Sequence, residues 1–109
     1  FGCDIAREIL PGCGYDDEFI KKVTDIIDGH DTRSESYSIE DSIMRDSDRL
    51  WRFNPVGLGF SAEWFGKTPQ QIRHKLEVDI LPEMITPTGK AMAEAELQHS
   101  IRVLALDVL

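Results

Sequence analysis

The sequence has few cysteines, few basic residues and no long apolar run. Its two cysteines, Cys3 and Cys13, lack the second cysteine or histidine pair that a structural zinc site needs, so we expect reduced thiols and a cytoplasmic protein. No apolar run approaches the roughly 20 residues that cross a bilayer, which argues against a membrane span. The first residues also lack the basic segment and apolar core of a secretory signal.

Basic residues are outnumbered, with 12 Lys and Arg against 20 Asp and Glu and a formal net charge of −8. Nucleic acids are bound by clustered Lys and Arg that contact the phosphates, and the basic residues of this chain are too sparse for such a surface. We therefore expect no nucleic-acid partner. An acidic chain can still bind a small phosphorylated ligand when a metal cation supplies positive charge locally.

Long stretches of alternating apolar and polar residues are also missing, so the sequence predicts no convincing strand. Helical spacing and helix-terminal residues recur instead, and we predict an all-α fold, a helical bundle that forms a single domain over residues 1–109. The expected helices run from Asp4 to Leu10, Asp16 to Gly29, Ser38 to Phe53, Ser61 to Phe65, Thr68 to Pro82, and onwards from Thr86. Pro55, Gly57 and Gly59 indicate a loop, and Trp64 and Phe65 are expected to pack against other side chains.

His30 follows a helix whose apolar side chains recur at three- and four-residue steps from Phe19 to Ile27. The histidine continues this apolar face, so we expect it to point towards the core or a cleft in it. A histidine at the edge of the core with a satisfied hydrogen bond is the alternative.

The next helix carries two aspartates near its apolar stripe. Asp46 lies within the stripe, and Asp48 lies at its margin. An ionised carboxylate among apolar side chains is costly unless it is paired or bound to a cation, so a metal ligand and a salt bridge to Arg45 or Arg49 are the two interpretations of Asp46.

At the start of the same helix, Glu40 and Asp41 are explained by a solvated face with local arginine pairs. Asp41 is also expected to complete a variant of the capping box, reaching back to the backbone of Ser38.

The run Arg45-Asp46-Ser47-Asp48-Arg49-Leu50-Trp51 resembles the late helix of the HD superfamily of metal-dependent phosphohydrolases, whose local sequence is typically Asp-Ala-Asp-Lys/Arg-Leu. In that superfamily an all-helical domain holds a divalent cation with a histidine, a His-Asp doublet and an aspartate from this late helix. The second aspartate of the run is the ligand. The resemblance therefore implies that Asp48 is the metal ligand, with Asp46 and His30 as secondary candidates.

His30-Asp31 is not equated with the central doublet, because one short loop separates it from the aspartate helix and no histidine precedes His30. It resembles instead the helix end that precedes the final-aspartate helix in many members. We therefore interpret the chain as the C-terminal part of an HD-type bundle, incomplete at its N-terminus, and expect the other ligands to lie upstream of Phe1 or to have been lost.

The resemblance implies hydrolysis of a phosphoester or nucleotide by water activated on a divalent metal ion, namely Mn, Fe, Mg, Ni or Zn. Arg49 and Arg33 are candidate contacts to the substrate phosphate, with surface ion pairs as the alternative. A non-catalytic HD-like helical module that binds a ligand is the alternative function. A homo-oligomer formed through the broad apolar face of the last helix, which includes Met92 and Val103, is a further one.

Overall fold

The computed structural model describes residues 1–29 and 35–107, and every regular element in these ranges is a helix. This confirms the all-α prediction. Backbone contacts divide the chain into two compact units, Phe1–Met44 and Arg45–Leu109. Among the helices of the described ranges, none combines the length and the apolar character needed to cross a membrane.

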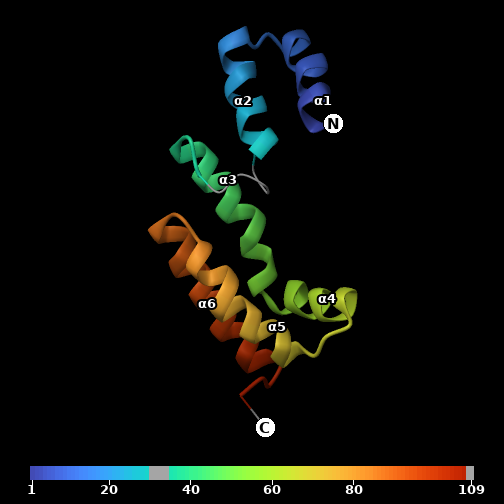
Figure 1. Cartoon of the computed structure of the whole chain (residues 1–109), viewed down its shortest axis with the longest axis vertical. Helices are drawn as coiled ribbons and strands as arrows, with labels where there is room; N and C mark the ends of the chain where they lie inside the picture. Colours follow the sequence, from blue (N-terminus) through green and yellow to red (C-terminus); the bar gives the residue numbers. More distant parts are fainter. Residues whose placement is uncertain (30–34, 108–109) are drawn as a thin grey trace. The chain divides into compact units, whose positions relative to one another are not determined.

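In the first unit, α1 (Gly2–Ile9) packs against α2 (Asp17–Gly29), as Figure 1 shows in blue. The helices approach closely at Gly2, where a Cβ atom would lie 3.0 Å from a methyl group of Ile27. A short 3-10 helix, η1 (Leu10–Cys13), follows α1 and ends at Gly14 with a φ of 90°. Asp16, where this helix was predicted to begin, is its N-cap, because its Oδ1 accepts a hydrogen bond of 2.8 Å from the N–H of Phe19.

Helix α3 (Ile39–Leu50) begins at the predicted cap, because Ser38 Oγ accepts a hydrogen bond of 3.1 Å from the N–H of Asp41. The carboxylate of Asp41 accepts from the N–H of Tyr37 at 3.0 Å, one residue before the position expected for a capping box. Asp41 is fully buried, so its predicted place on a solvated face is wrong, whereas Glu40 is exposed. The 3-10 turn η2 (Trp51–Phe53) continues α3 to the predicted end.

Residues that were expected to form a loop belong to helix α4 (Pro55–Phe65). Asn54 caps it by accepting a hydrogen bond of 2.7 Å from the N–H of Gly57. Gly57 is needed there because a Cβ atom would lie 1.9 Å from the carbonyl oxygen of Trp51. The close packing of α4 on η2 therefore outweighs the low helix propensity of glycine. Gly66 ends α4 in the left-handed conformation, directly after the predicted end at Phe65.

Thr68 and Gln71 form a reciprocal capping box at the start of α5 (Pro69–Lys75). The chain continues as a π-helical segment, η3 (Leu76–Ile80), and a 3-10 turn, η4 (Leu81–Glu83). The predicted interruption at Pro82 thus takes the form of a change in helix type, since proline lacks the N–H that a regular turn requires. The last helix, α6 (Pro87–Val103), begins after its cap at Thr86, as predicted.

The second unit has a hydrophobic core shared by α4, α5, α6 and the turns between them; its main buried side chains are Phe53, Leu58, Ala62, Ile72, Leu76, Met84, Ala93, Leu97, Ile101 and Leu106. Figure 1 shows α6 in orange to red. Its buried face includes Leu97 and Ile101. Met92 and Val103 lie outside this face and are 50% and 57% exposed. The apolar face of α6 is therefore narrower inside the unit than the sequence predicts.

Candidate functional site

Helix α3 positions three of the candidate site residues in its second half: Asp46, Asp48 and Arg49. His30 and Arg33 lie outside the residues that the structure describes. The three positioned side chains have different surroundings, because successive residues of a helix project in different directions.

Asp46 is 4% exposed and both of its carboxylate oxygens accept hydrogen bonds from the start of α6. Oδ1 accepts from the N–H of Ile85 at 2.8 Å, and Oδ2 accepts from the N–H and the hydroxyl of Thr86, each at 2.7 Å. The negative charge lies close to the positive end of the α6 dipole. These N–H and hydroxyl groups are the partners of the buried Asp46 carboxylate. A metal ion or an arginine was expected in this role.

Gly89 makes room for this arrangement. A Cβ atom at Gly89 would lie 2.6 Å from Asp46 Oδ2 and 2.8 Å from the hydroxyl oxygen of Thr86. The hydroxyl of Thr86 also accepts a hydrogen bond of 2.9 Å from the N–H of Gly89. A hydrogen-bonded cluster at the N-terminus of α6 thus consists of Asp46, Thr86 and Gly89.

Asp48 is half-buried, and its carboxylate has neither a hydrogen bond nor an ion pair with any residue that the structure describes. Over the same ranges, no group of three His, Cys, Asp or Glu side chains is close enough together to hold a metal ion. One carboxylate does not hold a catalytic cation by itself, so the described residues do not fit a complete metal site.

Arg49 is 17% exposed and ties α3 to η4. Its Nη1 donates a hydrogen bond of 3.1 Å to the carbonyl oxygen of Glu83, and its Nη2 lies 3.8 Å from a carboxylate oxygen of the same residue. The guanidinium group therefore holds two elements of the second unit together. Its proposed contact with a substrate phosphate stays a prediction.

The second unit also contains a concave surface that the sequence did not predict, which we call the aromatic groove. It has a volume of about 320 Å³ and is lined by Trp51, Arg52, Phe60, Ser61, Trp64, Phe65, Ile72, Lys75, Leu76 and Ile80. Trp64 and Phe65, which were expected to pack, are 73% and 60% exposed and are not part of the core. The spacing of Phe60 and Trp64, one turn apart on α4, is the sequence signal for such a row of rings.

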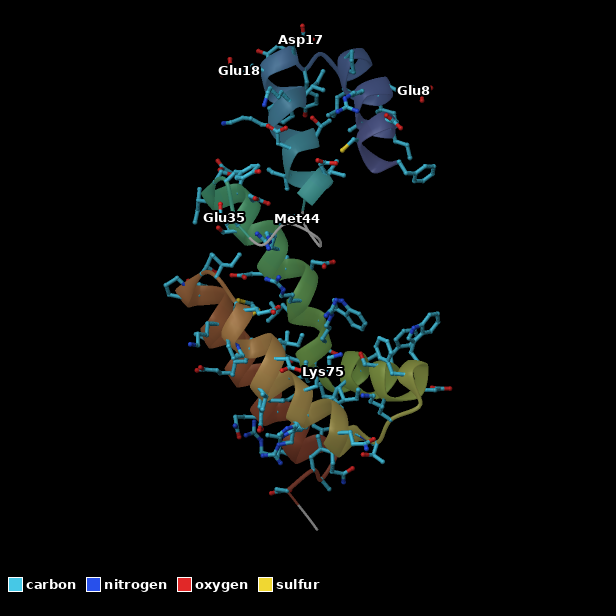
Figure 2. The ribbon with its side chains drawn as sticks, in the orientation of Figure 1. Glu8, Asp17, Glu18, Glu35, Met44 and Lys75 are labelled. Carbon is cyan, nitrogen blue, oxygen red and sulfur yellow. The ribbon has the colours of Figure 1, made fainter. Side chains whose placement is uncertain are left out.

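Aromatic contacts order the α4 side of the groove. The rings of Trp51 and Phe60 meet edge to face with centroids 6.2 Å apart, and those of Phe60 and Trp64 stack at 5.9 Å. On the facing helix α5, the ammonium group of Lys75 lies 5.7 Å from the centroid of the Phe65 ring. Figure 2 labels Lys75 on this helix.

Comparisons with models of protein families, with curated proteins and with solved structures find no match for this chain.

Proposed function

We propose that this chain is part of an HD-type metal-dependent phosphohydrolase in which Asp48 supplies one carboxylate ligand to a divalent cation. The observation that supports this assignment is the difference between the two aspartates of α3. The oxygens of Asp46 are occupied by the start of α6, whereas Asp48 is half-buried and has no partner in the described part of the chain. This is the aspartate that the resemblance to the HD superfamily assigns as the ligand.

The proposal requires further ligands from outside the described residues, because Asp48 alone does not hold a cation. The chemistry that a bound cation supplies is an activated water and neutralisation of charge on the phosphoryl oxygens. The substrate class is a small phosphorylated molecule, such as a phosphoester or nucleotide. Arg49, adjacent in the sequence to Asp48, is held in place by Glu83 and is the described residue proposed to contact the phosphate.

Manganese binding tests the role of Asp48 directly. The full chain is titrated with Mn²⁺, and free Mn²⁺ is measured by electron paramagnetic resonance. Asp48→Asn is expected to weaken binding by about tenfold or more, since it removes a charged oxygen ligand. The matched control is Asp79→Asn, because Asp79 is also an aspartate of the second unit and is exposed. Hydrolysis of bis(4-nitrophenyl) phosphate with Mn²⁺ is measured on the same samples.

Circular dichroism establishes that both variants are folded, which is expected because Asp48 has no partner to lose in the described ranges. If the unsubstituted chain does not bind Mn²⁺, or if Asp48→Asn binds it as tightly as Asp79→Asn does, Asp48 is not the metal ligand of this chain.

The second candidate function is a non-catalytic helical module that binds a ligand or a second copy of the chain. The exposed aromatic side chains of α4, above all Trp64 at 73%, favour it, because exposed apolar surface is common at binding sites. Sedimentation equilibrium at increasing concentration tests self-association: a mass that stays at the monomer value rules out the homo-oligomer. For both candidates we propose a cytoplasmic location, where the free thiols of Cys3 and Cys13 stay reduced.

A further inference from the structure

The aromatic groove has the size and the lining of a small-molecule site. Its volume of about 320 Å³ lies at the lower end of the range for ligand pockets, roughly 300–1,000 Å³. Aromatic rings from η2 and α4 line one side, and Ile72, Leu76 and Ile80 contribute aliphatic surface from α5 and η3. One ring system or a short acyl chain fits this space, whereas a folded partner does not enter it.

The charged side chains that line the groove are positive, whereas the net charge of the chain is negative. Acidic residues outnumber basic ones by 20 to 12 in the sequence, but the lining contains Arg52 and Lys75 and no carboxylate. Within the described part of the chain, neither of these side chains forms an ion pair or a hydrogen bond, and the recorded contact of the Lys75 ammonium is with the ring of Phe65.

Four other basic side chains have acidic partners, namely Arg7 with Asp4, Lys21 with Asp25, Arg49 with Glu83 and Arg73 with Glu77. The two unpaired cations of the groove lie beside apolar surface, where a charge is screened less than in open water. They favour a ligand that carries negative charge next to an apolar body.

We propose that the aromatic groove binds a small apolar molecule with one anionic group, such as an aromatic or acyl carboxylate. The apolar part lies against Phe60, Trp64 and Leu76, and the carboxylate accepts hydrogen bonds from Arg52 and Lys75. This site is separate from Asp48, which is not among the lining residues, and it does not depend on the proposed hydrolase function.

A titration of the full chain with 2-naphthoate tests this proposal. The chain has two tryptophans, Trp51 and Trp64, and both line the groove, so their indole N–H resonances report on its occupancy. We expect both resonances to shift and to saturate with a 1:1 stoichiometry. The matched ligand 2-naphthylmethylammonium has the same ring with the opposite charge, and it should bind roughly tenfold more weakly.

Variants separate the charge contribution from the apolar one. The double substitution Arg52→Gln and Lys75→Gln should weaken 2-naphthoate binding roughly tenfold and change binding of the uncharged 2-naphthalenemethanol by less than about twofold. Lys67→Gln is the control, because Lys67 is exposed and is not part of the groove. Trp64→Ala should weaken binding of both ligands. We expect this variant to fold, because the side chain of Trp64 is mostly exposed.

Three results would overturn the proposal. The first is the absence of any indole shift at millimolar 2-naphthoate, and the second is equal binding of the anionic and cationic ligands. The third is a dimer in sedimentation experiments whose indole resonances respond to dilution but not to 2-naphthoate, because a second copy of the chain would then occupy the groove.

Discussion

Asp46 accepts hydrogen bonds from both the backbone N–H and the hydroxyl of Thr86, with each donor 2.7 Å from Oδ2. Thr86 is itself the N-cap of α6, and its hydroxyl accepts from the N–H of Gly89. A buried carboxylate of α3 therefore fixes the capping residue of another helix. The first turn of α6 depends on a side chain that lies 40 residues away from its cap in the sequence.

Asp46→Ala should lower the free energy of unfolding by about 3 kcal/mol, because the part-buried N–H groups of Ile85 and Thr86 lose the charged acceptor that the buried carboxylate provides. Urea unfolding followed by circular dichroism measures the change. Asp48→Ala, two residues along the same helix, is the control and should change stability by less than about 0.5 kcal/mol. Equal losses for the two variants would show that the contact with α6 does not stabilise the protein.

Two glycines of α4 should respond to alanine in opposite ways. Gly57→Ala should destabilise the protein by about 2–3 kcal/mol, because its Cβ would lie 1.9 Å from the carbonyl oxygen of Trp51. Gly59→Ala has no atom within 4 Å of its Cβ and should stabilise the protein by about 0.5–1 kcal/mol through its higher helix propensity. The midpoint of thermal unfolding of each variant measures the sign of the effect. A stabilising Gly57→Ala would contradict the close packing of α4 on η2.

Arg49 should stabilise the protein mainly through the backbone of Glu83. Arg49→Gln should cost about 1–2 kcal/mol, because it removes the hydrogen bond that the guanidinium group donates to the carbonyl oxygen of Glu83. Glu83→Gln should cost less than about 0.5 kcal/mol, since the carboxylate is 59% exposed and 3.8 Å from Nη2. Urea unfolding at low salt and at about 0.5 M NaCl distinguishes the two contacts, because salt screens only the ion pair strongly. Equal costs that both disappear in salt would mean that the ion pair dominates.

Ser100→Ala should lower stability by about 1–2 kcal/mol, because the fully buried hydroxyl of Ser100 donates a hydrogen bond to the carbonyl oxygen of Phe53. Ser61→Ala, in the interior of α4, is the matched control and should be neutral or stabilising by a few tenths of a kcal/mol. Denaturant unfolding of both variants gives the difference. A neutral Ser100→Ala would show that this bond contributes nothing to the packing of α6 on η2.

Four helix starts were predictable because their caps are local. Asp16, Ser38, Thr68 and Thr86 each accept a hydrogen bond from an N–H three residues later, so the information lies within one turn of sequence. The end of α4 is also a local feature, since the left-handed conformation at Gly66 favours glycine.

The errors arose where distant packing decides the outcome. Gly57 and Gly59 read as loop residues by propensity, but packing of α4 on Trp51 makes this segment helical. Trp64 was expected to pack, but it is 73% exposed, and its position at the rim of the aromatic groove was not visible in the sequence.

The candidate site was partly readable. The apolar stripe of α3 correctly indicated that a carboxylate at position 46 needs a partner, because burial of an isolated charge is costly. The identity of that partner was not readable, since the N–H groups of Ile85 and Thr86 are 39 and 40 residues away. Asp41 was misassigned to a solvated face, although it is fully buried.

The close contact between Asp46 and Gly89 couples two positions that lie far apart in the sequence. Any side chain at position 89 collides with the carboxylate of Asp46, so glycine there is required as long as position 46 keeps its aspartate. The two positions are therefore expected to change together during evolution: a side chain at position 89 requires both a smaller residue at position 46 and a shift of the Thr86 hydroxyl, which lies 2.8 Å from the same Cβ position. Such paired substitutions would show in sequence alone that Asp46 of α3 lies beside the first turn of α6.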